Sequence, residues 1–391
     1  MRPFMEKAPR RKDTMMKIIN GVFASAKIFT ADAENPVDSY AEAQIRMLCN
    51  HEALEGCKIR IMPDVHPGKV GTIGFTMTVR DKIMPNLVGI DIGCGIALAR
   101  IRQKKIEYQK LDSVIRDGIP SGFGVRKQPH HYADSFDFSR LCCHRSIREK
   151  KAALSLGTLG GGNHFIEADR DESGNLYVVI HSGSRHLGKE VAEFYLNQGQ
   201  RELKARGKEI PYELTYLEGS LMEDYLHDLQ VVQEFAALNR AAMMDVLMKE
   251  MKWKTEERYD CIHNYVQDTE EERILRKGAI SAQTGERLVI PINMRDGIIL
   301  GTGKGNTEWN CSAPHGAGRI LKREEAGRNF TVSAYKAQMK GIYSSCINRD
   351  TLDEAPFAYR SLEQIRGAIS ETAKIDKIIT PVYNFKAGRD Q

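Results

Sequence analysis

The sequence predicts an α+β fold that forms a single unit of 391 residues. Apolar runs, such as residues 87–99 and 176–180, have the composition of buried strands, and reactive side chains stand within them or at their ends. Residues 212–252 carry apolar side chains near a 3.6-residue period, which predicts one or two long helices. No internal repeat or low-complexity linker divides the sequence, which argues against freely jointed domains.

Charge and cysteine content set only broad limits. The chain has 57 Lys and Arg against 52 Asp and Glu, a balance that permits a polyanionic partner without predicting one. It has no run of about 18 apolar residues, and its basic segment 1–12 lacks the apolar core of a signal peptide, so we expect a cytoplasmic protein. The eight cysteines follow no regular spacing and are expected to be free thiols there.

The first part of the chain is expected to be mainly structural. Residues 1–20 predict a flexible basic lead-in, 21–29 a strand and 38–50 an amphipathic helix. The next run, I-R-I-M-P-D-V-H-P-G-K, predicts a strand followed by a loop that carries Asp64 and His66. Reactive side chains collect at strand ends, but a turn-forming Asp and a surface His are equally expected here.

Residues 87–99 are almost wholly apolar except for Asp91, and Cys94 follows it by three positions between two glycines. A charge in a buried strand needs a partner. A carboxylate and a thiolate at this spacing can converge on one divalent ion, which favours ionisation of the thiol. The alternative is a buried free Cys beside an Asp that pairs with Arg.

The following segment, residues 103–152, is polar and mixed. Its loop 119–131 is rich in Gly, Pro and basic residues, which is compatible with a nucleic-acid groove and also with an ordinary solvated loop. We expect His130, His131 and His144 at the surface.

Three glycines lead into Asn163 and His164 on a predicted strand. Alternation along this strand places His164 and Ile166 on one face and Asn163, Phe165 and Glu167 on the other.

A turn at 172–175 then predicts a hairpin, whose second strand ends at His181 beside the first. A helix is predicted from about Leu187, and an anion at its N-terminus would meet Ser182, Ser184 and Arg185.

The last third of the chain contributes further candidates. A short strand at 259–265 presents His263 and Asn264, and a helix at 361–373 precedes an apolar segment that ends near Lys386. The glycines of G-T-G-K-G-N, residues 301–306, predict free backbone N–H groups that face phosphate oxygens.

The segment S-A-P-H-G-A-G-R places His315 between a Pro and a turn of small residues, where its imidazole is displayed rather than packed. Beside a phosphate-binding loop this pattern indicates a nucleophile next to a nucleotide. A solvent-exposed structural His is the alternative.

Four histidines therefore join Asp91 and Cys94 at strand ends or glycine turns: His164, His181, His263 and His315. This N, O and S donor set suits a borderline divalent ion such as Mn, Zn or Fe, and six candidates exceed the needs of one tetrahedral site. Two metals, or one metal and a nucleophile, are both consistent with it.

The chain resembles the RtcB family of GTP- and manganese-dependent RNA ligases. The motifs that carry the resemblance span roughly residues 60–390 in the family order, and they read M-P-D-V-H, V-G-I-D-I-G-C-G, G-G-G-N-H-F-I-E, V-I-H-S-G-S-R, H-N-Y-V, R-K-G-A-I-S-A, G-K-G-N and H-G-A-G-R. The resemblance implies a single catalytic domain with a central dimetal cleft.

The resemblance also implies roles for individual residues. His315 would attack the α-phosphorus of GTP to give a histidine–GMP intermediate. Two Mn²⁺ ions would be held by Asp91, Cys94, His164, His181 and His263, with Cys94 bridging. The guanylate would be held by Asn163, His164, Phe165, Ile166, Glu167, His263, Asn264, Pro291, Ile292, Asn293, Met294, Ile298, His315, Gly316, Ala317, Gly318 and Lys386.

In such a reaction an RNA 2′,3′-cyclic phosphate is opened to a 3′-phosphate, GMP is transferred to that phosphate, and a 5′-hydroxyl displaces GMP to join the strands. We expect RNA repair by a monomer, with no membrane partner. Alternatives are a metal-dependent cyclic phosphodiesterase, an enzyme that guanylylates 3′-ends without joining them, and a GTP- and RNA-binding protein without turnover.

The sequence departs from the family pattern at residues 291–298. Where the family usually has P-G-S-M-G-x-x-S, this chain has P-I-N-M-R-D-G-I, so Ile298 replaces a serine expected near the nucleotide. Ala313-Pro314 and Leu321-Lys322 also differ from the usual residues. These changes predict an altered guanine pocket, whereas every metal-ligand position is kept.

Overall fold

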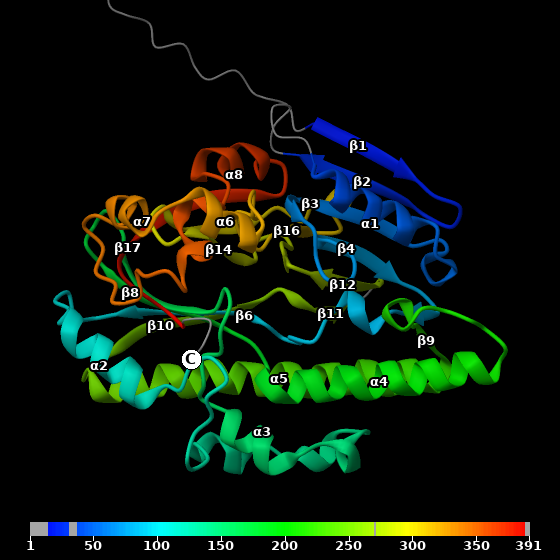
Figure 1. Cartoon of the computed structure of the whole chain (residues 1–391), viewed down its shortest axis with the longest axis horizontal. Coiled ribbons are helices and arrows are strands. Elements are labelled where there is room, and N and C mark those ends of the chain that lie inside the picture. Colours follow the sequence, from blue (N-terminus) through cyan, green and yellow to red (C-terminus); the bar gives the residue numbers. More distant parts are fainter. Residues whose placement is uncertain (1–14, 31–36, 270, 388–391) are drawn as a thin grey trace, which may run out of the picture.

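Two large sheets form the centre of the computed structural model, which describes residues 15–30, 37–269 and 271–387 (Figure 1). In spatial order the six-stranded sheet contains β1 (Met15–Asn20), β2 (Ser25–Thr30), β3 (Lys58–His66), β4 (Ile73–Val79), β12 (Arg273–Lys277) and β11 (Asn264–Asp268). The seven-stranded sheet contains β10 (Thr255–Ile262), β6 (Gly95–Ile101), β8 (Leu176–Ser182), β7 (Phe165–Arg170), β17 (Ala373–Lys386), β15 (Gly297–Gly303) and β14 (Arg287–Asn293). The paired strands are antiparallel except for β2 and β3.

Two small ribbons complete the strands of the described residues. They pair β13 (Ala279–Ser281) with β16 (Ser312–Pro314) and β5 (Lys82–Ile83) with β9 (Leu217–Glu218). The first ribbon matters for the site because β16 leads directly into His315.

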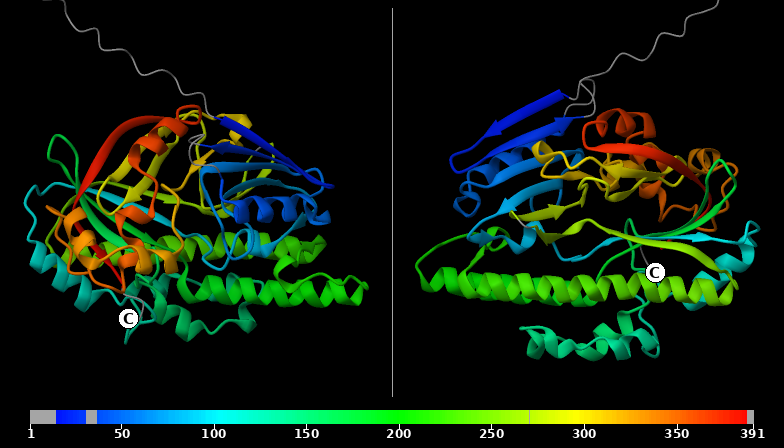
Figure 2. Two further views of the ribbon diagram at one scale, coloured as in Figure 1. Left: turned by 45° about the horizontal axis from the view of Figure 1, so that its top comes forward. Right: turned by 180° about the vertical axis from the view of Figure 1, so that it is seen from behind.

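Helices cover both sides of this strand framework (Figure 2). On one side, α4 (Arg185–Ala205) and α5 (Gly219–Glu250) run along the sheets, with α2 (Tyr108–Gly118) and α3 (Glu149–Ser155) nearby. On the other side lie α1 (Ser39–Cys49), α6 (Arg323–Asn329), α7 (Val332–Gln338) and α8 (Leu362–Ala368). The fold is therefore α+β, as the sequence predicts.

The seven-stranded sheet is buried on both faces. Along β7, Phe165 joins the apolar cluster that includes Ile290 and Ile299, while Ile166 joins the cluster that includes Leu247 on α5. The alternation predicted for this strand is confirmed. A strand covered on both faces gives its ends a fixed position, which suits it to hold a site.

The N-terminal prediction is wrong for residues 15–20. They form the edge strand β1, which pairs with β2 from Met15↔Thr30 to Asn20↔Ser25. Local sequence gives little signal for such a strand because its stability comes from the hairpin partner. Residues 1–14 of the predicted lead-in lie outside the described residues.

Several predicted boundaries also shift. Residues 212–252 contain one long helix, α5, and the helix expected near Leu187 begins at Arg185. The strand expected at 259–265 is divided at His263 between β10 and β11, which belong to different sheets.

Within the described residues, no helix is long and apolar enough to cross a membrane.

Candidate functional site

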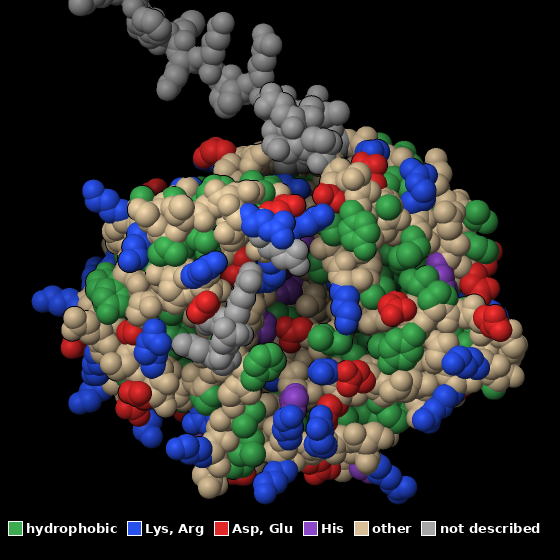
Figure 3. All heavy atoms as spheres, in the orientation of Figure 1, with side chains coloured by type: hydrophobic (Ala, Val, Ile, Leu, Met, Phe, Trp, Pro, Cys, Tyr) green, Lys and Arg blue, Asp and Glu red, His purple; other side chains and the backbone are tan. Residues whose placement is uncertain are grey.

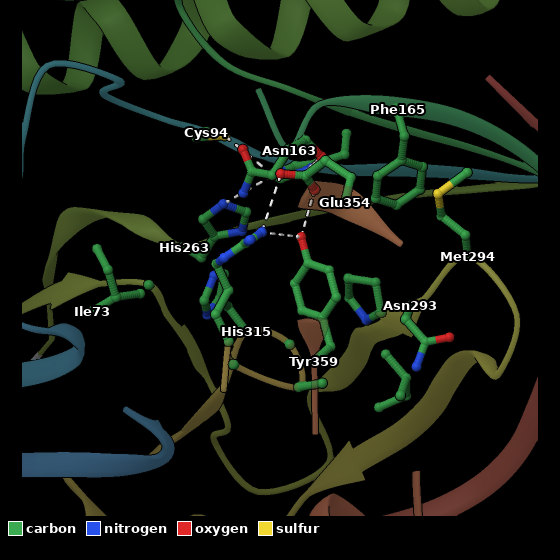
Figure 4. Close-up of a pocket in the computed structure, with 18 of the residues that line it drawn as sticks. Ile73, Cys94, Asn163, Phe165, His263, Asn293, Met294, His315, Glu354 and Tyr359 are labelled. Carbon is green, nitrogen blue, oxygen red and sulfur yellow. Dashed lines mark hydrogen bonds and ion pairs between the residues drawn. The ribbon is translucent and has the colours of Figure 1, made fainter. Parts of the chain in front are cut away.

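A cavity of about 300 Å³ opens between the two large sheets. Its walls come from the ends of β3, β7, β8 and β17 and from the turns around His263 and His315. Figure 3 shows the cavity as a hollow with His side chains inside and Lys and Arg side chains around its edge. In Figure 4, Cys94 and His263 lie on one side of the cavity, Phe165 and Met294 on the other, and Glu354 and Tyr359 between them.

A group of five side chains, which we call the His–Cys cluster, occupies one end of this cavity and consists of Asp91, Cys94, His164, His181 and His263. The Cys94 Sγ lies 3.3 Å from His181 Nε2 and 3.5 Å from His164 Nε2. His164 Nε2 lies 3.0 Å from Asp91 Oδ2, and His181 Nε2 lies 3.2 Å from His263 Nε2. The ligand atoms fall into two groups that share Cys94, one with Asp91 and His164 and the other with His181 and His263.

Backbone hydrogen bonds fix the orientation of these imidazoles. The Nδ1 atoms of His164 and His181 lie 2.8 Å and 3.2 Å from the carbonyl oxygens of Leu159 and Asn163, so Nδ1 carries the proton in both rings. Their Nε2 lone pairs therefore point into the cluster. The buried Nδ1 of His263 has no hydrogen-bond partner.

The donor set fits divalent metal ions. Burial lowers the pKa of His181 and His263 well below the usual range, so both rings are neutral, and their Nε2 atoms lie 3.2 Å apart. Burial and the nearby Asp91 raise the pKa of Cys94, a preference that a bound divalent ion reverses. Imidazole nitrogens, a thiol and a carboxylate that converge in this way form a donor set that binds divalent ions.

Asp91 reaches the cluster differently from the prediction. Residues 87–99 are not one buried strand, because β6 begins only at Gly95 and Asp91 lies in the preceding turn with a side chain that is 31% exposed. The Cys94 N–H donates to the Asp91 carbonyl at 3.2 Å and so closes this turn. Gly183 is required nearby, since a Cβ there would stand 2.0 Å from Asp91 Oδ1.

His315 faces this cluster from the end of β16. Its Nδ1 lies 2.7 Å from Oδ2 of Asp64, which also accepts the backbone N–H of His315 at 3.2 Å. Asp64 is fully buried within β3 and therefore is not on the loop that the sequence predicts. A carboxylate at Nδ1 holds the proton there and leaves Nε2 as a free lone pair. The His315 ring stacks at an angle on His263, with centroids 4.8 Å apart.

Three cations surround one buried carboxylate in the middle of the cavity. Glu354 pairs with Arg323 Nη1 at 2.7 Å, with Lys386 Nζ at 3.0 Å and with Arg319 Nη1 at 3.2 Å. Burial raises the pKa of Glu354, but these cations outweigh it and lower the pKa to about 2. Tyr359 donates its hydroxyl to the same carboxylate. We call these five side chains the Glu354 cluster.

Glu167 marks the end of the cavity opposite the metal-type donors. Its carboxylate accepts a hydrogen bond from Asn384 on the neighbouring strand β17. Burial raises the pKa of Glu167 to about 7, and burial beside Glu167 also raises that of Asp169. The aromatic face of Phe165 lies 5.4 Å from the Lys386 ammonium. This end therefore combines an apolar surface with a few polar groups.

The structure brings most of the predicted nucleotide residues to one place. Those that line the cavity are Asn163, Phe165, Glu167, His263, Asn264, Pro291, Ile292, Asn293, Met294, His315, Gly316, Ala317, Gly318 and Lys386. His164 lies in the His–Cys cluster. Ile166 and Ile298 pack into the apolar cores on either face of the seven-stranded sheet and do not line the cavity.

Two other predictions about polar segments are wrong. The backbone N–H groups of Gly303, Lys304 and Gly305 donate to the carbonyls of Glu286, Thr372 and Ala282, so none is free for phosphate. His130 is buried rather than at the surface, and its Nδ1 accepts the Tyr132 N–H at 3.3 Å.

At the start of α4, where the sequence predicts an anion site, Arg185 and Ser182 bind protein groups, whereas the buried Ser184 hydroxyl has no hydrogen-bond partner among the described residues. Arg185 donates to Thr158 Oγ1 at 3.1 Å and to the Gly122 carbonyl at 2.8 Å. Ser182 donates to Leu159 O at 2.7 Å. Both side chains therefore brace the loops that carry the site.

Sequence reasoning missed the roles of Asp64 and of the carboxylate at the centre of the Glu354 cluster. Asp64 has a usable signal, because an Asp inside an otherwise apolar strand requires a buried partner. Glu354 has none, because its three cations come from sequence positions up to 35 residues away.

A family model described as "tRNA-splicing ligase RtcB" matches residues 47–144 and 134–387. The chain belongs to the RtcB family. It is 32% identical over 357 residues to the RNA-splicing ligase RtcB1 of Escherichia coli strain ATCC 25922, which covers 81% of this chain and 87% of that protein. The RNA-splicing ligase RtcB of Escherichia coli K12 is 31% identical over the same shares. The tRNA-splicing ligase RtcB of Aeropyrum pernix is 28% identical over 78% of this chain and 82% of its own.

The RtcB match includes every part of the site. Its two matched ranges extend from before Asp64 to beyond Lys386 and so contain the His–Cys cluster, the Asp64–His315 pair and the Glu354 cluster. The family resemblance seen in short motifs therefore extends to residues that the motifs do not contain.

Proposed function

We propose that this chain is an RNA ligase that joins an RNA 3′-phosphate or 2′,3′-cyclic phosphate end to a 5′-hydroxyl end, with GTP as the energy source. The observation that carries the proposal is the Asp64–His315 pair, whose free Nε2 faces the cavity beside the His–Cys cluster. The printed names of the relatives, which are RNA- and tRNA-splicing ligases, support the choice of RNA.

The first step belongs to His315. Its Nε2 lone pair attacks the α-phosphorus of GTP, the bond from that phosphorus to the bridging oxygen breaks, and pyrophosphate leaves. The Nδ1 proton stays in its hydrogen bond to Asp64, 2.7 Å away, and the carboxylate stabilises the cationic imidazole of the adduct. The product is a phosphoramidate, which passes GMP onward readily.

The later steps use the same adduct. A cyclic phosphate is first opened by water to a 3′-phosphate. An oxygen of that phosphate attacks the GMP phosphorus, the P–N bond to His315 breaks, and the imidazole regains its lone pair. The 5′-hydroxyl of the second RNA end then attacks the activated 3′-phosphorus. The new phosphodiester bond forms, the bond from that phosphorus to GMP breaks so that GMP leaves, and the hydroxyl proton passes to solvent.

Two divalent ions, proposed to be Mn²⁺, would be held by Asp91, Cys94, His164, His181 and His263, with the Cys94 thiolate shared. When bound, they supply positive charge that offsets the negative charge of the phosphates. The donor geometry supports such ions, because neutral imidazoles and the Cys94 sulfur converge there, with neighbouring donor atoms within 3.5 Å of one another.

The rest of the cavity is suited to hold the nucleotide. The Glu354 cluster has three cations against the carboxylates of Glu354 and Asp353, and the remaining positive charge favours phosphate oxygens nearby. Glu167 and Phe165 offer a polar group and an aromatic face to a purine base. The replacement at Ile298 lies in the core, so Ile292, Asn293 and Met294 are the changed or adjacent residues that would touch the base.

The histidine–GMP step is tested with GTP labelled at the α-phosphate in the presence of Mn²⁺. We expect label on the protein that survives alkali, is released by acid and is absent from His315→Ala. His227→Ala is the matched control, because His227 is exposed and lies outside the cavity. Metal-loaded protein that takes no label would contradict the mechanism.

A second assay decides what the adduct is used for. RNA with a 3′-phosphate end and a 5′-hydroxyl end should give a longer product that resists phosphatase. A guanylylated 3′-end without a longer product would favour a capping enzyme, and simple ring opening would favour a cyclic phosphodiesterase. We also propose that the chain works as a cytoplasmic monomer with a single catalytic unit, in RNA repair.

A further inference from the structure

A tight turn beside the loop that leads to the cavity residue Asn163 holds the aromatic ring of Phe123 in solvent. The Gly124 N–H donates to the Ser121 carbonyl at 3.0 Å and closes the turn, with Gly122 at a φ of +61° and Phe123 at its tip. Phe123 is 91% exposed, which is more than any other large hydrophobic side chain of the described residues. A soluble protein gains nothing in folding from a phenyl ring in water.

This turn is fastened to the loop that carries the site. Ser121 forms a parallel bridge with Gly160, and the Gly122 N–H donates to the Gly160 carbonyl at 2.8 Å. The Leu159 N–H donates to the Pro120 carbonyl at 2.8 Å. Two residues after Gly161, Asn163 lines the cavity and is exposed. Phe123 therefore keeps a fixed position relative to the reacting groups.

The surface between Phe123 and the cavity has little side-chain cover. A Cβ at Gly161 would meet only the Cα of Gly122, at 3.6 Å, and a Cβ at Gly162 would meet only Arg323 Nη2, at 3.9 Å. Both glycines thus form a shelf that leaves room for a chain to pass from solvent toward Asn163.

Other exposed apolar side chains also stand next to the cavity. Ile90 is 51% exposed and precedes the metal-type donor Asp91, and Ile320 is 51% exposed and follows the cavity residue Arg319. Basic residues accompany them, since Lys127 and Arg323 are exposed on the same loops or beside them. Figure 3 shows hydrophobic and basic side chains together along the edge of the hollow.

We propose that Phe123 stacks on an unpaired base of the RNA strand whose end enters the cavity. Flat bases suit an exposed aromatic ring, and the presence of both apolar and basic groups suits a single strand, which exposes both bases and phosphates. A duplex keeps its bases inside and offers no face to such a ring. The stacked base is one of the first few from the reacting end, and it holds that end above the glycine shelf.

This inference rests on the proposed RNA ligase function and adds a residue that positions the RNA. It assigns Phe123 no part in the reaction of GTP with His315, because RNA is absent from that step. Loss of the ring should therefore separate RNA binding from guanylylation.

The test compares full-length wild-type protein with Phe123→Ala, Phe123→Trp and Phe123→Leu. The probe is a single-stranded RNA with a 3′-phosphate and with 2-aminopurine at successive positions from that end, since its fluorescence reports stacking. We expect Phe123→Ala to weaken RNA binding and raise the KM for RNA by roughly tenfold. Labelling by GTP should be unchanged, and Phe123→Trp should bind at least as well as the wild type.

The remaining variants test whether the effect requires an aromatic ring at position 123. Phe123→Leu keeps an apolar side chain without an aromatic face, so it should resemble Phe123→Ala and lose the fluorescence change at the stacked position. Tyr40→Ala is the matched control, because Tyr40 is 57% exposed on α1 and does not line the cavity.

If Phe123→Ala or Phe123→Leu keeps the wild-type affinity and KM for RNA, the stacking proposal is overturned while the ligase assignment stands. The exposed ring would then serve as a contact for another protein. Wild-type protein that takes the GTP label but neither binds nor joins such RNA overturns both proposals together.

Discussion

The two polar clusters of the cavity are opposites in how their charges are matched. In the His–Cys cluster, neutral metal-type donors face one another, as in the 3.2 Å contact between the Nε2 atoms of His181 and His263. In the Glu354 cluster, Glu354 accepts from two arginines, a lysine and a tyrosine. Both lie in the same buried cavity, so burial alone does not explain the difference.

The difference separates a site that needs an ion from one whose side chains already form ion pairs with one another. Converging lone pairs are tolerated when a cation is bound, and that cation then contributes to stability as well as to chemistry. A carboxylate surrounded by cations holds their side chains in place without any ligand, which prepares them for an anion. Each cluster should respond to a different perturbation.

Loss of the shared thiol should have the largest effect. Cys94→Ala removes the ligand common to both metal groups, so bound Mn²⁺ should fall and protein labelling by GTP should slow by about 10³-fold, since metal charge supplies several kcal/mol. Elemental analysis after dialysis and the rate of label uptake measure the two effects. Cys49→Ala, a buried thiol on α1, is the control. The contrast fails if Cys94→Ala keeps its metal.

The Glu354 cluster should instead respond independently of metal. Glu354→Gln leaves Lys386 and Arg319, which are largely buried, without their shared carboxylate, and this should lower the free energy of unfolding by about 3 kcal/mol. Urea unfolding should show the same loss with Mn²⁺ and with a chelator. Glu257→Gln, in an exposed pair with Arg287, should change stability by less than about 1 kcal/mol. A loss that appears only with Mn²⁺ would mean that the two clusters are not separate.

Asp64 belongs to neither cluster, because it orients the nucleophile His315 and is not one of the proposed metal ligands. Asp64→Asn lets an amide N–H face His315 Nδ1, which moves the ring proton toward Nε2 and removes the free lone pair. Labelling by GTP should slow by about 100-fold while Mn²⁺ content stays at the wild-type level. An equal loss of metal would place Asp64 in the His–Cys cluster.

Local sequence reveals those residues of the site that have reactive side chains next to glycines. Cys94 and His315 each stand beside glycines, and such reactive residues in turns are visible without a structure. Asp64 is 251 residues from His315, so only the tertiary fold pairs them. The same distance effect hides Glu354.

Sequence also misleads where the same pattern of residues is compatible with two different structures. The glycines of residues 301–306 read as a phosphate loop, yet β-sheet and turn hydrogen bonds use the backbone N–H groups at 303–305. The Ile298 replacement suggests a changed pocket, but its strand turns the side chain into the core. In both cases the sheet decides which groups are free, and the sheet is assembled from distant strands.

Glu167 is an intermediate case and should give the smallest effect. Burial raises its pKa in the folded protein to about 7 from its ordinary value of 4.5. Between these values the folded state holds a proton that the unfolded state has released, so stability falls as pH rises from about 4.5 to about 7 and is level above it. Glu167→Gln should lack this fall. The free energy of unfolding of the variant, relative to the wild type, should therefore be about 2 kcal/mol higher at pH 8 than at pH 5.

Urea unfolding of both proteins at pH 5 and pH 8 measures the difference, with Glu257→Gln as an exposed control. Parallel curves for wild type and Glu167→Gln would show that Glu167 is ionised in the folded state throughout this range. Glu167 would then belong with Glu354, as a carboxylate whose neighbours fully support its charge. A fall in the free energy of unfolding that occurs only in the wild type would make Glu167 resemble the His–Cys cluster. Its ionised carboxylate would then need a ligand in the cavity to stabilise it.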